Sequence, residues 1–321
     1  MNIAPEGDQH ARRKPPAHFV LGSVQLGAQY GKIRKFNFPS HDEAVVLMRR
    51  AAELGVREFD TARNYGEAEV RLGAAFDPAS HPLPEGARIV TKLHPMQQLP
   101  ADLSEGEARR AVEESIEASC RSLRTRYLPI VMLHLAYLRH AWNGAAWQRL
   151  LEYKAAGVIG ELGLSAVTPE EAIRFLDDPL IKHMQVPINI LDARWAKLDA
   201  ARHFARRPDV TVHARSIFLQ GVLLQKDVTG WPARSTEAPA LITWLDETAR
   251  RFGLASVAQL AVSYLRGLGW LDGLVVGIEN ETQLRENLKL FAAPPLDDAA
   301  IAQVDATRPA FAAWLLDPGQ W

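Results

Sequence analysis

Short apolar runs alternate with longer amphipathic segments along most of the chain. Runs such as Ile89–Thr91 and Leu128–Leu133 have the length and composition of buried strands. The segment from Ser40 to Leu54 places apolar residues at helical spacing, and Ser40 with Glu43 matches a capping box. Connections of this length cannot be hairpins, so the strands must pair in parallel through crossover helices. The pattern predicts an α/β fold, a parallel eight-stranded (β/α)8 TIM barrel with long loops at its C-terminal face and a C-terminal helix and tail.

The boundaries of the expected elements follow from this alternation. The expected strands are His18–Gly22, Gly55–Phe59, Arg88–Lys92, Leu128–Leu133, Ile159–Leu164, His183–Pro187, Val210–Ala214 and Leu271–Val276. The expected helices after the first are Glu67–Phe76, Ser104–Leu123, Trp142–Ala156, Pro169–Leu176, Trp195–Arg206, Ala240–Phe252, Ser256–Leu265, Glu281–Leu290 and Asp297–Val304. A doubly wound sheet is a weaker alternative, because the glycines after the first strand do not form a Gly-x-Gly-x-x-Gly turn.

Length and charge narrow the class of protein. At 321 residues, one barrel domain over residues 18–321 accounts for the chain, and residues 1–17 are expected to form a flexible tail. The net charge of −1 gives no reason to expect nucleic acid or an anionic membrane as a partner. No apolar run reaches the roughly 20 residues that span a bilayer. Cys120 is the only cysteine, which fits a reducing, cytoplasmic compartment.

Four ionisable residues lie at or just beyond the ends of three expected strands. They are Asp60, Tyr65, Lys92 and His134. Each has an ordinary explanation when taken alone: a turn aspartate, a half-buried aromatic, a solvated lysine and a core histidine. In a parallel barrel, however, the carboxyl ends of the strands form one face, and active sites are built on that face. We therefore expect these side chains to meet in one site.

The residues around these positions resemble a known family. FDTARNYGEAEVRLG, VTKL and MLHL, in this order, resemble the Asp, Tyr, Lys and His tetrad of the aldo-keto reductases. The resemblance continues through GELGLSAVTPEEA, HMQVPIN, ARSIFLQGVLL and VVGIENETQLRENL, and it covers Phe19 to about Leu290. It implies NAD(P)H-dependent reduction of an aldehyde or ketone to an alcohol, or the reverse reaction.

The resemblance gives each tetrad residue a role that its chemistry supports. Tyr65 would donate the proton, and Lys92 would lower the pKa of its phenol, which is otherwise about 10. Asp60 would hold the Lys92 ammonium, and His134 would orient the carbonyl. The hydride must come from a cofactor, NADPH or NADH, because no side chain can supply one.

The resemblance also implies where the cofactor binds. Ser165 and Gln185 match residues that hold the carboxamide, although Ala166 replaces the usual asparagine; Asn189 or water are candidates to supply the lost bond. Arg215 replaces a stacking tyrosine and is expected to stack on the nicotinamide, or else to form an ion pair with a carboxylate such as Asp192. The remaining expected cofactor contacts are Ser23, Ser216, Phe218, Gly221, Gly277, Glu279, Gln283, Glu286 and Asn287. Glu279 would repel a 2′-phosphate, so we expect NADH to serve at least as well as NADPH.

The substrate pocket and the competing functions stay open at this stage. The expected pocket residues are Val24, Gln25, Tyr30, His94 and Tyr137, and they fit a small-molecule carbonyl compound without choosing one. The alternatives are a nucleotide-binding redox-sensing or partner barrel with little turnover, and a class I aldolase using Lys92. A hydrolase with a metal bound by His94, His134 and His213 is disfavoured by the absence of paired ligand spacing, and no metal is expected. The sequence leaves the oligomeric state and the natural substrate undetermined.

Overall fold

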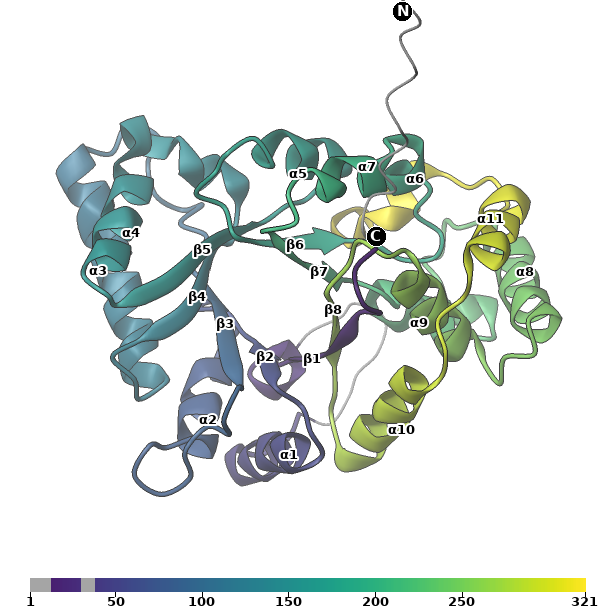
Figure 1. Cartoon of the computed structure of the whole chain (residues 1–321), viewed down its shortest axis with the longest axis horizontal. Coiled ribbons are helices and arrows are strands. Elements are labelled where there is room, and N and C mark those ends of the chain that lie inside the picture. Colours follow the sequence, from purple (N-terminus) through teal and green to yellow (C-terminus); the bar gives the residue numbers. More distant parts are fainter. Residues whose placement is uncertain (1–12, 30–37) are drawn as a thin grey trace, which may run out of the picture.

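Eight parallel strands close into a barrel in chain order, as predicted (Figure 1). The structure, a computed structural model, describes residues 13–29 and 38–321. The strands are β1 His18–Gly22, β2 Glu58–Asp60, β3 Arg88–Lys92, β4 Leu128–Leu133, β5 Ile159–Ser165, β6 His183–Pro187, β7 Thr211–Arg215 and β8 Gly273–Gly277. The first and last strands pair over five residues, from His18 with Gly273 to Gly22 with Gly277, and this ladder closes the barrel.

The helices surround the barrel and cover the outer face of its strands (Figure 1). They are α1 His41–Glu53, α2 Ala68–Ala75, α3 Glu105–Ser122, α4 Ala145–Ala155, α5 Pro169–Phe175, α6 Arg194–Lys197, α7 Ala200–Ala205, α8 Ala238–Arg251, α9 Val257–Gly267, α10 Glu281–Ala292 and α11 Asp298–Thr307. The capping box of Ser40 and Glu43 is present at α1, and Ser104 with Glu107 forms a second one at α3. None of the helices in the described ranges is both long and apolar enough to cross a membrane.

The alternation of side chains along each strand separates the barrel interior from the layer under the helices. On β4, Ile130 and Met132 contact Val90 inside the barrel, whereas Val131 and Leu133 belong to the large core beneath the helices. Residues two apart share a face. When one residue of a strand faces the barrel interior, the residue two positions later also faces it. That second residue lies one layer nearer the C-terminal face.

Two helix predictions need correction. The expected helix Trp195–Arg206 is divided into α6 and α7, because Asp199 adopts a left-handed conformation with φ of 49° between them. The expected helix Trp142–Ala156 begins only at Ala145, because Trp142 and Asn143 both have positive φ. Each of the two expected segments contains a residue with positive φ, which interrupts the helical hydrogen bonds. The pattern of hydrophobic positions does not predict such a residue.

Part of the segment assigned to a flexible tail is bonded to the barrel. The Lys14 backbone N–H donates to the Gly269 carbonyl at 2.9 Å, and the Lys14 ammonium lies 2.6 Å from the Asp272 carboxylate. Residues 1–12 lie outside the described residues. In the described part of this segment, residues 13–17, the chain is therefore held to the barrel.

Candidate active site

Lys92, the last residue of β3, lies at the centre of the candidate site. Its Nζ atom donates to both Asp60 carboxylate oxygens, at 2.7 and 2.9 Å, and to the Thr61 carbonyl oxygen at 3.0 Å. The Lys92 side chain is only 1% exposed. A buried ammonium is tolerated only when its donors are satisfied and a counter-charge is present, and the end of β2 supplies both. Burial alone would lower the pKa of Lys92, but Asp60 and Tyr65 outweigh burial and raise it. Lys92 is therefore a fixed cation.

Tyr65 reaches this cation from the loop between β2 and α2. Its hydroxyl oxygen lies 3.4 Å from Lys92 Nζ. The loop is fixed by a close backbone crossing: the Glu67 N–H donates to the Gly27 carbonyl at 3.0 Å, and Gly66 has φ of +57°. A Cβ atom on Gly27 would collide with the Tyr65 carbonyl oxygen. Two glycines therefore allow the crossing that places the phenol over Lys92.

His134 follows β4 directly and faces the tyrosine. The two rings meet edge to face, with 5.9 Å between their centroids. The His134 Nδ1 atom is buried and has no hydrogen-bond partner among the described residues. Burial, together with the nearby positive charges of Lys92 and Arg215, lowers the pKa of His134 to about 3. The imidazole is therefore neutral at physiological pH.

Gln185 joins the group from the opposite side of the barrel. Its side-chain Nε2 atom donates to Asp60 Oδ1 at 2.7 Å, so this carboxylate oxygen accepts from both Lys92 and Gln185. The resemblance assigns Gln185 to the cofactor carboxamide. In the structure it lines the pocket and also holds Asp60 in position. This contact links β6 to β2 through the barrel interior.

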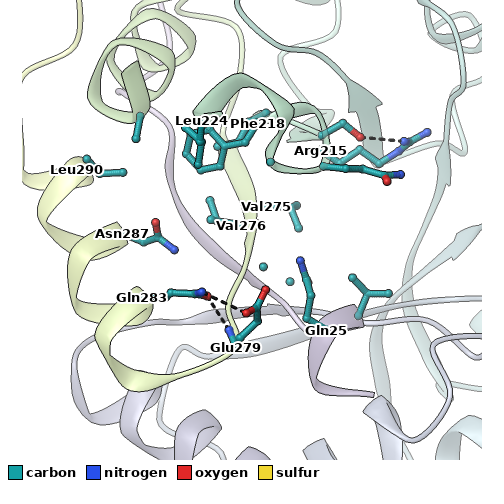
Figure 2. A pocket seen from close by; sticks show the side chains of 18 of the residues that line it. Gln25, Arg215, Phe218, Leu224, Val275, Val276, Glu279, Gln283, Asn287 and Leu290 are labelled. Atoms are coloured by element: carbon teal, nitrogen blue, oxygen red, sulfur yellow. Dashed lines mark hydrogen bonds between the residues drawn. The ribbon is translucent and has the colours of Figure 1, made fainter. Parts of the chain in front are cut away.

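A cavity of about 630 Å³ extends from Asp60 and Tyr65 to helix α10. Figure 2 shows Arg215 and Phe218 on one side of it and Gln283, Asn287 and Leu290 of α10 on the other. The expected cofactor residues that line it are Gln185, Arg215, Ser216, Phe218, Gly221, Gly277, Glu279, Gln283, Glu286 and Asn287. Ser23 and Ser165 are buried, at 0% and 3% exposure, and are not among the residues that line it.

The expected substrate residues are divided between two places. Val24 and Gln25 line the cavity, next to Tyr65. Tyr137 lies in a separate hollow with His140 and Phe175, and its hydroxyl donates to the Pro95 carbonyl at 3.0 Å. His94 accepts the Met96 N–H through Nδ1 and is not among the residues that line the cavity. Tyr30 lies outside the described residues.

Arg215, the last residue of β7, points along the cavity wall. Its Nη2 atom donates to the Ala166 carbonyl at 3.1 Å, and Nη1 lies 3.5 Å from Ser216 Oγ (Figure 2). The alternative ion pair with Asp192 does not form, because Arg194 occupies that carboxylate at 2.8 Å. Ala166, which replaces the family's asparagine, is thus bonded through its backbone to the arginine that replaces the family's tyrosine. The two departures from the family pattern lie side by side.

The far end of the cavity is formed by β8 and α10. Gln283 accepts the Glu279 N–H through Oε1 at 2.9 Å, and its Nε2 atom lies 3.4 Å from Glu279 Oε2 (Figure 2). Arg285, the cation nearest to Glu279 in the sequence, is bound to Glu281 at 2.6 Å. Glu279 therefore presents a negative charge to this end of the cavity.

Several residues of this cavity are not expected from the sequence. They include Ser256, Ala258, Lys289 and Leu290. Leu290 could have been found, because residues 283, 286, 287 and 290 follow the spacing of one helix face. Ser256 and Ala258 come from the start of α9, and nothing local in the sequence places that segment beside the cavity.

The geometry weighs against the two other catalytic alternatives. A Schiff-base lysine must be reached by substrate as a free amine, whereas Lys92 is buried and held as a cation by Asp60. The metal-hydrolase alternative required His213 to join His134. Instead, His213 lies 2.8 Å from Glu58 at the start of β2, toward the opposite end of the barrel. Of the predicted tetrad, Asp60 and Tyr65 line the cavity, and Lys92 and His134 lie directly behind them.

The fold and this site together define a class, a parallel (β/α)8-barrel enzyme with its ionisable residues at the C-terminal face. The family model described as the aldo/keto reductase family matches residues 18–309. The chain belongs to the aldo/keto reductase family, and it is an NAD(P)-dependent oxidoreductase.

Relatives and solved structures agree with this assignment. The L-glyceraldehyde 3-phosphate reductase of Escherichia coli (strain K12) is 24% identical over 287 residues, covering 81% of this chain and 82% of that protein. The uncharacterized oxidoreductase YqkF of Bacillus subtilis (strain 168) is 22% identical over 297 residues, covering 88% and 89%. The holo form of aldo-keto reductase AKR11C1 from Bacillus halodurans has the same fold, with a TM-score of 0.72 at 19% identity over 95% of this chain and 99% of that one. Carbonyl reduction is thus the general chemistry of the relatives.

Proposed function

We propose that this enzyme reduces an aldehyde or ketone, with Tyr65 as the proton donor. The observation that carries the proposal is the contact of Lys92 with Asp60 on one side and with the Tyr65 hydroxyl on the other. The cavity opens directly on Tyr65. A proton donor must lie at the carbonyl oxygen, and this phenol is the donor beside the cavity whose conjugate base has a fixed cation next to it.

Each neighbour of Tyr65 contributes one physical effect. The Lys92 ammonium stabilises the negative charge that develops on the phenol oxygen when the proton leaves. Asp60 and Gln185 keep the ammonium in place, so no reorganisation is needed during the reaction. His134 is neutral, so it offers a hydrogen bond to the substrate oxygen without adding a charge that competes with Lys92.

The cavity fits a nicotinamide dinucleotide. It is long, it runs from the tetrad to α10, and the side-chain oxygens of Gln25 and Gln220 on its wall have no partner among the described residues. When bound, the reduced cofactor supplies the hydride that no side chain can provide. Arg215 would lie against the nicotinamide, Ser216 and Gly221 would follow the pyrophosphate, and Asn287 would lie at the adenine. Leu224 and Leu290 add apolar surface at that end (Figure 2).

The same cavity supports NADH as a cofactor at least as good as NADPH. Glu279 faces the adenosine end, and Arg285 is already paired with Glu281. Lys289 also lines the cavity, but it is far from Glu279 along the helix. It lies eight residues after Glu281, the first residue of α10, which is about 12 Å from the end of the helix that follows Glu279. A carboxylate beside a ribose accepts its hydroxyl groups and repels a 2′-phosphate.

Steady-state assays of the purified protein test both parts of the proposal. A panel of small aldehydes and ketones, including phosphorylated and unphosphorylated hydroxyaldehydes, is offered with NADH and with NADPH. The proposal predicts turnover of at least one compound and a kcat/KM with NADH equal to or above that with NADPH. A preference for NADPH of a hundredfold or more would refute the cofactor assignment. Tight binding of either cofactor without turnover of any compound would favour the redox-sensing alternative.

A further inference from the structure

A second group of titratable side chains lies at the end of the barrel opposite to the active site. His18 and Glu58 are the first residues of β1 and β2, and His213 lies on β7. Glu58 Oε2 is 2.8 Å from His18 Nε2 and 2.8 Å from His213 Nε2. These three ligand atoms lie within 4.8 Å of one another. The proposed reduction uses none of these residues.

The alternation of side chains explains why the three residues meet. Glu58 and Asp60 are two residues apart on β2, so they share its inner face, and Asp60 belongs to the active-site layer. His213 and Arg215 have the same relation on β7. The strand register places Gly273 beside both His213 and His18, and Gly273 has no side chain to fill the space between the two rings. The group therefore spans the seam where the last strand meets the first.

The orientation of His213 differs from that of an ordinary hydrogen-bonded histidine. Its Nε2 atom is close to Glu58 Oε2, yet it is buried and makes no hydrogen bond among the described residues, because the contact is not aligned. The nitrogen lone pair is therefore available to an ion. Tetrahedral zinc ligands at about 2.0–2.1 Å from the metal lie about 3.3 Å apart, so the nitrogen and the carboxylate oxygen would separate by about 0.5 Å when an ion binds between them.

The surroundings supply what a metal ligand needs from its neighbours. His213 Nδ1 lies 3.2 Å from His183 Nε2, a contact that holds the ring; with an ion on Nε2, the Nδ1–H group of His213 would donate to His183. Arg88 is bonded to Glu58 through Oε1, and Oε2 is bonded to His18 Nε2 at 2.8 Å, so an ion would take the place of that second hydrogen bond. The His18 side chain is 49% exposed, whereas those of Glu58 and His213 are 5% and 0% exposed. An ion would therefore enter from the side of His18 and keep a water molecule as its fourth ligand.

We propose that His18, Glu58 and His213 form a binding site for a divalent transition metal ion of the zinc class. Two imidazole nitrogens and one carboxylate oxygen are a ligand set that zinc accepts with water in the remaining position. None of the three residues lines the cofactor cavity, so the role that we infer for the ion is structural. It ties β1, β2 and β7 together across the closing seam of the barrel.

Zinc titration of the full-length protein tests this proposal. The protein is stripped with a chelator, dialysed against metal-free buffer and titrated with Zn²⁺ alone in competition with a chromophoric chelator. The expected result is one equivalent of bound zinc and a rise in Tm on the order of 5 °C at saturating zinc. Co²⁺ in place of Zn²⁺ should give the visible absorption bands of a low-symmetry site with nitrogen and oxygen ligands.

Variants separate this site from adventitious binding by surface histidines. His18→Ala changes a half-exposed side chain and is expected to fold, to weaken zinc binding at least tenfold and to lose the rise in Tm. His81→Ala, at an exposed histidine elsewhere on the chain, should bind zinc as the wild type does. Glu58→Gln should also bind zinc more weakly.

The proposal is refuted if the wild type binds no stoichiometric zinc, or if His18→Ala binds as tightly as the wild type. In that case the three residues form only a hydrogen-bonded cluster. Neither result bears on carbonyl reduction, which the aldehyde panel tests separately.

Discussion

At the scale of single residues, the site depends on how one buried charge is held. Lys92 has three hydrogen bonds to oxygen atoms at the end of β2, and Asp60 has a further donor in Gln185. A buried ion pair adds little stability by itself, but loss of one partner leaves an uncompensated charge. The arrangement is therefore best explained as support for Tyr65, whose hydroxyl lies 3.4 Å from the same ammonium.

Replacing Tyr65 with phenylalanine should remove the proton donor and little else. We expect kcat for aldehyde reduction to fall by about 10²- to 10⁴-fold, the usual contribution of a general acid. The Kd for NADH, measured by fluorescence titration, should stay within about twofold, because the aromatic ring is retained and only the hydroxyl is lost. Tyr137→Phe is the matched control: that hydroxyl bonds the Pro95 carbonyl in a separate hollow, and its loss should leave kcat unchanged. A near-normal kcat in Tyr65→Phe would assign the proton to another group.

His134 gives a prediction about pH. Its pKa is about 3 in the folded protein because of burial and nearby cations, against about 6.5 in an unfolded chain. Below pH 6.5 the unfolded chain therefore binds a proton that the folded protein does not, and the free energy of unfolding falls as the pH drops from 6.5 toward 3. His134→Gln lacks this effect. The free energy of unfolding of the wild type, minus that of the variant, should thus fall by about 1 kcal/mol for each pH unit between pH 6 and pH 4.

Denaturant unfolding at several pH values measures this difference. His140→Gln, which replaces an exposed histidine close by in the chain, should show the same pH dependence as the wild type. If the gap between wild type and His134→Gln is the same at pH 6 and pH 4, the imidazole is not held neutral by the fold.

The close approach of Asp60, Tyr65, Lys92 and His134 could be predicted from the sequence, whereas the contacts that support these side chains could not. Asp60, Lys92 and His134 close strands that the apolar runs indicate, so a parallel barrel brings them to one face. The bond from Gln185 to Asp60 joins residues 125 positions apart on opposite sides of the barrel, so no local pattern predicts it. The neighbouring positions of Ala166 and Arg215 are also a result of barrel closure, not of local sequence.

At the scale of elements, the loop between β2 and α2 is positioned by the backbone of another loop. Gly27 and Gly66 contact each other where the two segments cross, and their missing side chains make room for the crossing. Because backbone lies on both sides, neither segment can move away from an added methyl group. The position of Tyr65 is therefore set partly by a residue 38 positions earlier in the chain.

Gly27→Ala should disturb the active site without removing any catalytic group. The new Cβ atom would meet the Tyr65 carbonyl oxygen and the Ala68 nitrogen. We expect the free energy of unfolding to fall by about 1–3 kcal/mol, as in other overpacked sites, and kcat to fall at least tenfold. Gly106→Ala in α3 is the control, since the nearest atom to its Cβ would be 3.8 Å away. That variant should be as stable as the wild type or more so, by about 0.5–1 kcal/mol. Wild-type kinetics in Gly27→Ala would show that the loop can adjust.

The observed ends of the helices show which local sequence signals were sufficient to predict a boundary. Ser40 and Ser104 each precede a glutamate by three residues, and both helices begin there. Asp199 divides α6 from α7 through a left-handed conformation, which a sequence of apolar and polar positions cannot reveal. Capping is a local interaction and can be predicted, whereas this break depends on the chain's path over β6 and β7.

At the scale of the whole molecule, barrel closure brings together residues from both halves of the chain. The cavity proposed for the cofactor combines Val24 and Gln25 after β1 with Arg215 at the end of β7 and with α10. The same closure places His18 next to Glu58 and His213 at the other end. The disfavoured metal-hydrolase alternative placed His213 at the catalytic face, because this histidine lies near the end of an expected strand. The register with Gly273, the first residue of β8, instead places it one layer below Arg215.

Because the cavity joins segments from the start and the end of the chain, cofactor binding should stabilise the entire barrel. A ligand that binds only the folded state raises the free energy of unfolding by RT ln(1 + [L]/Kd), which is about 2.7 kcal/mol at a hundredfold excess over Kd. We expect this increase with NADH for the wild type and also for Tyr65→Phe, since the tyrosine is proposed to act on substrate. Arg215→Ala should need a higher NADH concentration for the same increase, because the guanidinium lies on the cavity wall. Denaturant curves at several NADH concentrations measure the effect, and curves that do not shift with NADH would show that the cavity is not the cofactor site.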